Sequence, residues 1–210
     1  NADGVEKAMQ MCKIAARQCA VLPSNVIVAS TGVIGMPLDV TPIEKSIGQL
    51  YWDLEHSVAG SRNAAEAIMT TDTTIKEVAV EFELGGKVCR MGGIAKGSGM
   101  IHPNLATMLI FITSDVAISS EMLQKALKAD VNKTFNMISV DGDTSTNDTV
   151  AIISNGMAGN KLINSEGEEY DVFCKALYMI TSKLCKMLAA DGEGATKLLE
   201  CIVTGGKDVQ

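Results

Sequence analysis

The sequence predicts a single layered domain of the α+β class. Of its 210 residues, 47% are apolar, which is enough to bury one sizeable core. Segments with helical spacing and segments with strand-like alternation both occur. They do not alternate strictly, so a doubly wound parallel sheet is not expected. No internal repeat, low-complexity tract or linker divides the chain.

The first sixty residues predict two helices and one short strand. A helix is expected over residues 3–20, because four apolar side chains recur on one side: Val5, Met9, Cys12 and Ala16. The apolar run 26–29 predicts a strand that leads into a tight loop at 30–35. A second helix is expected to start with Thr41 as its cap and Pro42 in its first position.

The middle of the chain predicts a helix, a hairpin and a further strand. Residues 61–69 are Ala-rich and favour a helix. Residues 76–97 predict a β-hairpin, since apolar and polar residues alternate and Gly85-Gly86 suits the turn. A Gly-rich loop then leads into the apolar run 107–113, which predicts a strand, and a short helix is expected at 119–130.

The last part predicts strands around a polar loop and one long helix. Strands are expected at 134–140 and 149–155. The long helix is expected from about residue 169 to 190, because five apolar residues share one face: Phe173, Leu177, Ile180, Leu184 and Met187. The apolar residues 198–204 predict a final strand.

Charge and cysteine usage narrow the class of protein. The net charge of −7 and isoelectric point near 4.9 argue against nucleic acid or an anionic membrane as a partner. No apolar run is long enough to span a bilayer, and no targeting signal is readable. The six cysteines lack C-x-x-C pairing and, with two distant histidines, supply no zinc site. We therefore expect reduced thiols, no metal and a cytoplasmic location.

Three stretches resemble site motifs without meeting their requirements. Lys96 stands before its glycine, whereas a phosphate-binding loop needs the lysine after the glycine and before a hydroxyl residue. The acidic loop 141–148 lacks the glycine and the final carboxylate of a calcium loop, so a solvated turn is preferred. His102 is interpreted as a loop residue rather than as a base for Thr107.

Thr107 stands where the Gly-rich loop meets the strand-like run, and two interpretations of it are open. A threonine at the start of a strand is ordinary. Alternatively it is a nucleophile: if the Ala106–Thr107 bond is cut, the free α-amine, with an ordinary pKa of about 7.7–8.0, becomes the base for its own hydroxyl. Gly97, Gly99 and Pro103 suit a loop held in an unusual shape ahead of that bond.

Five segments occur in a specific order: STGVIG, MTTDT, GGIAKGSGMIHPNLATML, VDGDTSTNDT and DGEGATK. Together they resemble the ornithine acetyltransferase family, the bifunctional glutamate N-acetyltransferases of arginine biosynthesis. The resemblance runs through nearly the whole chain, and five ordered motifs are far more specific than any one alone. It implies an αββα-type sandwich of mixed sheets flanked by helices, which is an autoprocessed scaffold with a threonine nucleophile.

The resemblance also implies an activity and its partners. The Ala106–Thr107 bond would be cut by the protein itself, and Thr107 would then carry an acetyl group from N-acetylornithine to glutamate in a ping-pong reaction. No cofactor is implied, although acetyl-CoA serves some members as a co-substrate. The family's usual assembly is a heterotetramer of two α and two β chains.

By motif match, five further residues would complete the site. Thr31 and Gly32 would form the oxyanion hole for the tetrahedral intermediate. Lys96 and Glu193 would line the substrate site, and Glu193 would also handle protons. Thr70 would contact substrate, and the adjacent threonine is the residue most easily confused with it.

Members of the family are longer than this chain, so residues 1–210 are expected to form a single but incomplete catalytic domain. Within it, 1–106 would end the α-chain segment and 107–210 would start the β-chain segment. Two other functions remain open. A related Thr-nucleophile aminopeptidase or amide hydrolase would pass the acyl group to water instead of glutamate. An inactive truncated module of the same fold would keep the Ala106–Thr107 bond intact.

Overall fold

The computed structural model describes residues 2–33, 35–99, 108–143 and 145–206. These residues contain a four-stranded sheet in the order β1-β2-β3-β4, formed by Lys76–Leu84, Lys87–Lys96, Leu109–Ser114 and Thr149–Ser154. β2 runs antiparallel to β1 and β3, whereas β4 runs parallel to β3. This mixed sheet with its helices confirms the α+β class, and the predicted hairpin and two further strands are present.

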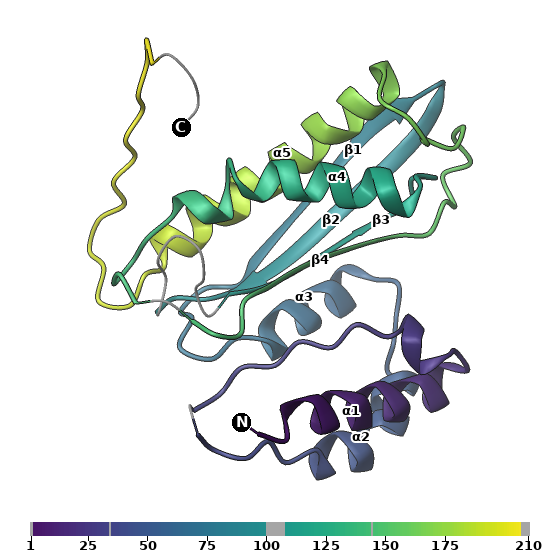
Figure 1. Cartoon of the computed structure of the whole chain (residues 1–210), viewed down its shortest axis with the longest axis vertical. Coiled ribbons are helices and arrows are strands. Elements are labelled where there is room, and N and C mark those ends of the chain that lie inside the picture. Colours follow the sequence, from purple (N-terminus) through teal and green to yellow (C-terminus); the bar gives the residue numbers. More distant parts are fainter. Residues whose placement is uncertain (1, 34, 100–107, 144, 207–210) are drawn as a thin grey trace.

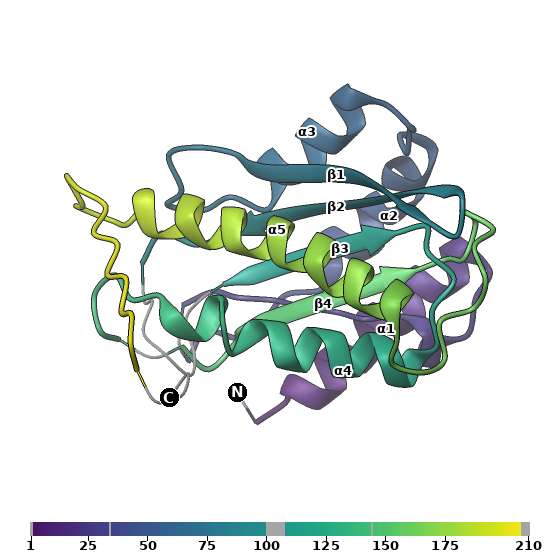
Figure 2. The ribbon, with the colours of Figure 1, turned by 90° about the horizontal axis from the view of Figure 1, so that it is seen from above.

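Two helices cover one face of the sheet, as Figures 1 and 2 show. α5 (Glu168–Ala190) packs on β1 and β2, and α4 (Ser120–Val131) packs against α5. The side chain of Ser119 accepts the Met122 N–H and caps the start of α4. α5 lies close to the sheet at Gly93, where an added Cβ would lie 3.1 Å from the side chain of Ile180. This face carries the main core, and the long helix predicted for residues 169–190 is confirmed within one residue.

Three helices lie on the other side of the sheet (Figure 1). α3 (Val58–Ala67) contacts β1 and β2, while α1 (Gly4–Cys19) packs against α2 (Thr41–Trp52) and the 3₁₀ turn Pro23–Asn25. The predicted cap of α2 is wrong by one residue, because the cap is Val40. The helix begins at Thr41 itself, and the carboxylate of Asp39 accepts the Thr41 N–H at 2.9 Å.

The described residues contain one sheet, not the two stacked sheets that the αββα sandwich requires. The sheet face turned away from α5 is only partly covered by α3. Between them lies a hollow of about 500 Å³, lined by Val58 and Ala64 of α3 and by Ile94 and Phe111 of the sheet. One of the two expected sheets, with helices on it, is therefore present in the described residues.

Three predicted strands are wrong, and each for lack of a partner. Residues 26–29 are irregular, and residues 134–140 instead contain the 3₁₀ turn Phe135–Met137. Residues 198–204 are extended but unpaired in the described part of the chain, with Leu199 90% exposed. Glu200 of this segment pairs with Lys186 of α5 at 2.7 Å. Apolar runs of this length form strands only where a neighbouring strand accepts their backbone hydrogen bonds.

Candidate functional site

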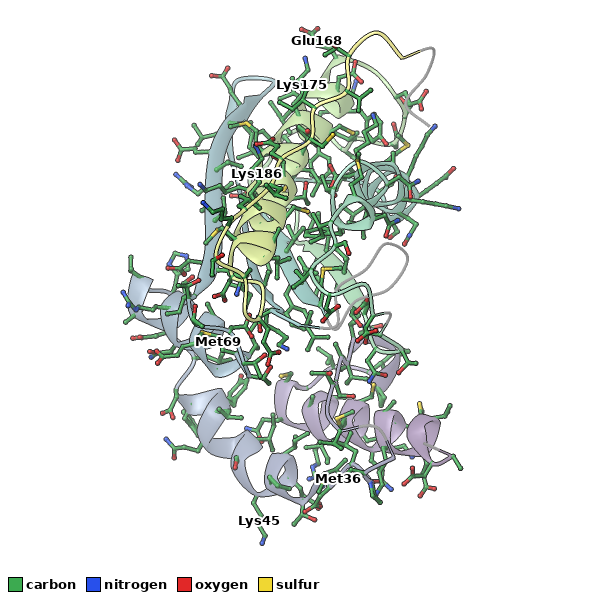
Figure 3. The ribbon with its side chains drawn as sticks, turned by 90° about the vertical axis from the view of Figure 1, so that its left-hand side faces the viewer. Met36, Lys45, Met69, Glu168, Lys175 and Lys186 are labelled. Carbon is green, nitrogen blue, oxygen red and sulfur yellow. The ribbon has the colours of Figure 1, made fainter. Side chains whose placement is uncertain are left out.

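Several of the sequence motifs meet at the end of β2 and the start of β3. Lys96 is the last residue of β2, and the register pairs it with Leu109, the first residue of β3. The segment 70–74 lies at the same place, because Asp72 accepts the N–H of Gly97, directly after β2. The C-terminal end of α5 lies there too, because Asp191 accepts the Thr73 N–H. Met69, which precedes this segment, lies between the sheet and the N-terminal helices (Figure 3).

The centre of this region is a buried ion cluster of Asp72, Lys76 and Asp191, which we call the Lys76 cluster. The Lys76 Nζ lies 2.7 Å from Asp72 Oδ1 and 2.5 Å from Asp191 Oδ2, and its side chain is fully buried. Asp191 follows the last residue of α5 and also accepts the backbone N–H of Thr73 at 3.0 Å. The cluster therefore joins β1, α5 and the segment before β1.

The carboxylates of this cluster are held in their charged form. Burial alone raises the pKa of Asp72, but hydrogen bonds from Gly97 and Lys76 outweigh it, so the pKa lies below its ordinary value. In the same way burial raises the pKa of Asp191, and hydrogen bonds from Lys76 and Thr73 bring it below the ordinary value. Because these buried charges are paired with each other, the cluster serves to hold the site together.

Lys96 is also buried, with 3% of its side chain exposed, but its charge is less well balanced. Its Nζ lies 4.0 Å from Asp72 Oδ2, and Asp72 already accepts three closer hydrogen bonds. Burial lowers the pKa of Lys96, and the negative charge of Asp72 opposes this only in part. An ammonium group placed in this way is suited to bind an anionic group of a ligand.

The loop after Lys96 is held by residues of the motifs MTTDT and DGEGATK. Asp72 accepts the Gly97 N–H at 2.7 Å, and the Ser98 hydroxyl lies 2.6 Å from the hydroxyl of Thr71. Ser98 O accepts the backbone N–H of Glu193 at 2.6 Å. A Cβ added to Gly99 would lie 2.6 Å from Glu193 Oε2, so a larger residue at this position would displace that carboxylate.

These contacts bring three of the predicted residues to one place: Lys96, Glu193 and Thr70. Thr70 is placed through its backbone, since its N–H bonds to Asp72 Oδ2 at 3.2 Å. Its neighbour Thr71 is the residue whose hydroxyl contacts the loop. The two threonines that the sequence could not separate thus have different contacts.

Thr31 and Gly32 lie in a separate hollow of about 360 Å³, lined by α1, by residues 30–33 and 35–38 and by Thr146 and Asn147. A Cβ added to Gly32 would meet no described atom within 4 Å, so the backbone there faces open space. No contact in the described residues joins this pair to Lys96 or Glu193. Asn147, which also lines this hollow, directly precedes Asp148 in the sequence.

Asp148 lies beside the first described residue after the Gly-rich loop. Its Oδ1 accepts the Met108 N–H at 2.9 Å, and Met108 O accepts the Thr149 N–H at 3.0 Å. Its Oδ2 is buried and has no hydrogen-bond partner in the described structure. Burial raises the pKa of Asp148 to about 6, and Met108 and Lys96 oppose this only in part.

Ala106, Thr107 and His102 lie outside the described residues, so the predicted cleavage site stays a prediction. In the part of the chain that the structure describes, no group of His, Cys, Asp and Glu side chains could hold a metal ion. None of the described helices has the length and apolar character needed to cross a bilayer.

Sequence reasoning missed four residues that build this region: Asp72, Lys76, Asp148 and Asp191. Three of them stand inside the quoted motifs MTTDT, VDGDTSTNDT and DGEGATK, and Lys76 stands four residues after Asp72. An acidic residue within a motif is visible in the sequence. Its pairing with a lysine 115 positions away is visible only in the fold.

A sequence model described as the ArgJ family matches residues 1–210. The chain is 50% identical over 203 residues to the arginine biosynthesis bifunctional protein ArgJ 1 of Clostridium acetobutylicum, covering 97% of this chain and 49% of that protein. It is 51% identical over 209 residues to the glutamate N-acetyltransferase of Methanocaldococcus jannaschii, covering 98% of this chain and 50% of that protein. It therefore spans about half the length of the curated relatives that it matches.

Among solved structures, the chain is similar to the crystal structure of the arginine biosynthesis bifunctional protein ArgJ from Bacillus halodurans. The identity is 48%, the TM-score is 0.40, and the match covers 41% of each chain.

Proposed function

Because this chain belongs to the ArgJ family, we propose that it forms part of an autoprocessed acyltransferase of arginine biosynthesis, which moves an acetyl group from N-acetylornithine to glutamate. The relative in Methanocaldococcus jannaschii is named a glutamate N-acetyltransferase. As the chain spans about half of such relatives, the activity of the whole protein, its substrates and its partners all belong to the proposal.

The observation that carries the proposal is the meeting of three motifs at the end of β2. There the loop 97–99 forms hydrogen bonds with the segment 70–72 and with Glu193, and the Lys96 Nζ lies 4.0 Å from Asp72 Oδ2. The register of β2 and β3 places this end beside Leu109, the first residue of β3, which follows Thr107 by two positions in the sequence. A cation beside that point is suited to pair with a substrate carboxylate, and a carboxylate there is suited to exchange protons during acyl transfer.

The first proposed step creates the nucleophile. The Thr107 hydroxyl attacks the Ala106 carbonyl carbon, the C–N bond breaks, and the nitrogen takes up a proton, which leaves an ester. Water then hydrolyses the ester, giving a carboxylate at Ala106, a free hydroxyl on Thr107 and a free α-amine. The amine can act as a base near neutral pH, which the amide nitrogen could not do.

Acetyl transfer then proceeds in two halves. The α-amine takes the proton of the Thr107 hydroxyl as its oxygen attacks the acetyl carbonyl of N-acetylornithine. Ornithine leaves with a proton, and an acetyl ester remains on Thr107. The amine of glutamate attacks this ester and releases N-acetylglutamate and the free hydroxyl. Thr31 and Gly32 stabilise the oxyanion in both halves.

The remaining residues bind substrate. Lys96 pairs with a substrate carboxylate, for which its weakly balanced charge is suited. Glu193, whose carboxylate lies next to Gly99, accepts and donates protons during the reaction. Thr70 contacts the bound amino acid. Acetyl-CoA as a second donor would need no residue beyond Thr107 and the oxyanion pair.

The proposal extends to the architecture. Residues 1–106 belong to the α chain and 107–210 to the β chain of one catalytic domain, in a cytoplasmic heterotetramer of two α and two β chains. The partly covered sheet face, with its hollow against α3, supports a second sheet there, which would complete the αββα sandwich.

Mass spectrometry tests the proposal directly. Intact mass should show two fragments, 1–106 and 107–210, and a brief incubation with N-acetylornithine should add one acetyl group to Thr107. The variant Thr107→Ala should abolish both the scission and the acetylation. Thr113→Ala, at an exposed threonine of β3, is the matched control and should behave like the unchanged protein.

The alternatives give different results in the same experiment. An uncut chain without acetyl-enzyme would contradict the proposal and favour an inactive module. Acetate release that does not depend on glutamate would favour a hydrolase.

A further inference from the structure

The two oxygens of the Asp72 carboxylate bond to different parts of the candidate site. Oδ1 accepts hydrogen bonds from the Lys76 Nζ and from the Gly97 N–H, both at 2.7 Å. Oδ2 accepts the Thr70 N–H at 3.2 Å and lies 4.0 Å from the Lys96 Nζ. One buried side chain therefore links the lysine that stabilises the fold to the segments that we assign to substrate binding.

Lys96 depends on Asp72 for a neighbouring negative charge. Its side chain is almost fully buried, and burial lowers its pKa. The charged groups that act on it come from three segments: Asp72 before β1, Lys76 in β1 and Asp148 before β4. Asp72 raises the pKa of Lys96 more than Asp148 does, while Lys76 lowers it. Asp191, at the end of α5, bonds to Lys76 instead.

The same carboxylate holds the backbone that follows β2. Gly97 has a φ of 148°, a conformation that favours glycine, and its N–H bonds to Asp72 Oδ1. The next residue, Ser98, bonds to the Thr71 hydroxyl through its side chain and to the Glu193 N–H through its carbonyl. Loss of the acceptor on Asp72 would therefore release the start of the loop that contacts Glu193.

We propose that Asp72 is a positioning residue for the acyl transfer: it keeps Lys96 charged and holds the backbone of Thr70 and Gly97, so that the ammonium group can pair with a substrate carboxylate. The inference rests on the proposed function. Asp72 acts through Lys96 rather than on the reacting atoms, and no covalent bond forms or breaks at it. It should therefore affect substrate binding more than the chemical step.

The experiment compares the natural protein with Asp72→Asn. The asparagine oxygen can replace Oδ1, but the amide group donates hydrogen bonds, so the acceptor for Thr70 and the negative charge beside Lys96 are lost. Lys76 keeps Asp191 as its partner, so the variant should still fold, which circular dichroism checks.

The titration of Lys96 separates positioning from a merely structural role. Its Cε resonance can be followed by carbon NMR and assigned by its absence in Lys96→Met. In Asp72→Asn the pKa of Lys96 should fall below its value in the natural protein, because burial then acts without the opposing charge. Loss of local structure would instead expose the ammonium group and raise its pKa towards the ordinary value of about 10.4. An unchanged or raised pKa would overturn the inference.

Substrate kinetics give a second signature. In Asp72→Asn the KM for N-acetylornithine should rise about 10-fold or more, while kcat changes by less than about three-fold. Because Lys96 is charged below its pKa and neutral above it, the rise in KM should be larger at about pH 9 than at about pH 7. Asp53→Asn, at an exposed carboxylate directly after α2, is the matched control and should leave KM unchanged. A fall in kcat at constant KM would contradict the assignment of Asp72.

A double variant covers the case in which Asp72→Asn does not fold. Adding Lys96→Met removes the ammonium group that would be left without its carboxylate, so the double variant should fold again or unfold at a higher urea concentration than Asp72→Asn. A double variant no more stable than the single one would refute the coupling. Absence of turnover with N-acetylornithine in the natural protein would instead refute the proposed function, and the titration would then decide the coupling of Asp72 to Lys96 by itself.

Discussion

The Lys76 cluster and Asp148 lie at the same end of the sheet but differ in how their buried charge is balanced. In the cluster, one ammonium group bonds to two carboxylates at 2.7 and 2.5 Å, and the pKa of both carboxylates is lowered. At Asp148 one oxygen has no partner, and the pKa is raised to about 6. The first arrangement stabilises the fold, whereas the second costs stability. A cost of this kind is typical of residues kept for function.

Breaking the cluster should have the largest effect on stability. Lys76→Met leaves two buried carboxylates without their cation, which should lower the free energy of unfolding by about 3–5 kcal/mol. Urea unfolding followed by circular dichroism measures this. Lys125→Met removes the exposed ion pair with Glu166 and is the control, with an expected loss below about 1 kcal/mol. Equal losses in the two variants would contradict the comparison.

The same pair of variants has a pH signature. A lowered pKa of Asp72 and Asp191 means that their contribution to stability is present above their ordinary pKa and is lost as the pH falls through the lowered values. Unfolding at about pH 7 and about pH 3 should therefore show the gap between Lys76→Met and the natural protein shrinking in acid. A gap that is independent of pH would indicate that lost packing, not charge, causes the effect.

Removing the charge of Asp148 should act in the opposite direction. A raised pKa means that ionisation destabilises the fold, so Asp148→Asn should raise the free energy of unfolding by about 2 kcal/mol at pH 7. The gain should vanish as the pH falls through about 6 towards 4, where the carboxyl group is protonated in both states. Chemical unfolding across this range measures it. A loss of stability at pH 7 would show that Asp148 is structural.

The smallest effect on stability is expected at Lys96. Among the described residues, the carboxylate that pairs with Lys96 lies at 4.0 Å and already bonds to Lys76, so Lys96→Met should change the free energy of unfolding by less than about 1 kcal/mol. Substrate binding should nevertheless be lost, which would appear as a strongly raised KM for N-acetylornithine. Two buried lysines would then differ in role, one for the fold and one for the ligand. Unfolding of Lys96→Met as severe as that of Lys76→Met would contradict this.

The sequence predicted those elements whose pattern is local. The hairpin of β1 and β2 follows from alternation and a glycine turn, and α5 follows from one apolar face. The strands predicted at 26–29, 134–140 and 198–204 were wrong because strand formation depends on a partner elsewhere in the chain. Short apolar runs carry no information about that partner.

The site shows the same division. Motif resemblance selected Lys96 and Glu193, and the fold brings them to one place. Asp72, Asp148 and Asp191 escaped notice because an aspartate within a polar loop is usually a solvated turn residue. Their burial comes from β-strand register and from the end of a helix, which are properties of the whole fold.

The order of the strands has a consequence for what happens to the protein if the Ala106–Thr107 bond is cut. β1 and β2 would then belong to one polypeptide and β3 and β4 to the other, while the antiparallel pairing of residues 91–96 with 109–114 would cross the break. α5, from the second polypeptide, packs on both strands of the first. The two pieces would therefore migrate as one particle in size-exclusion chromatography and separate only in denaturing gels.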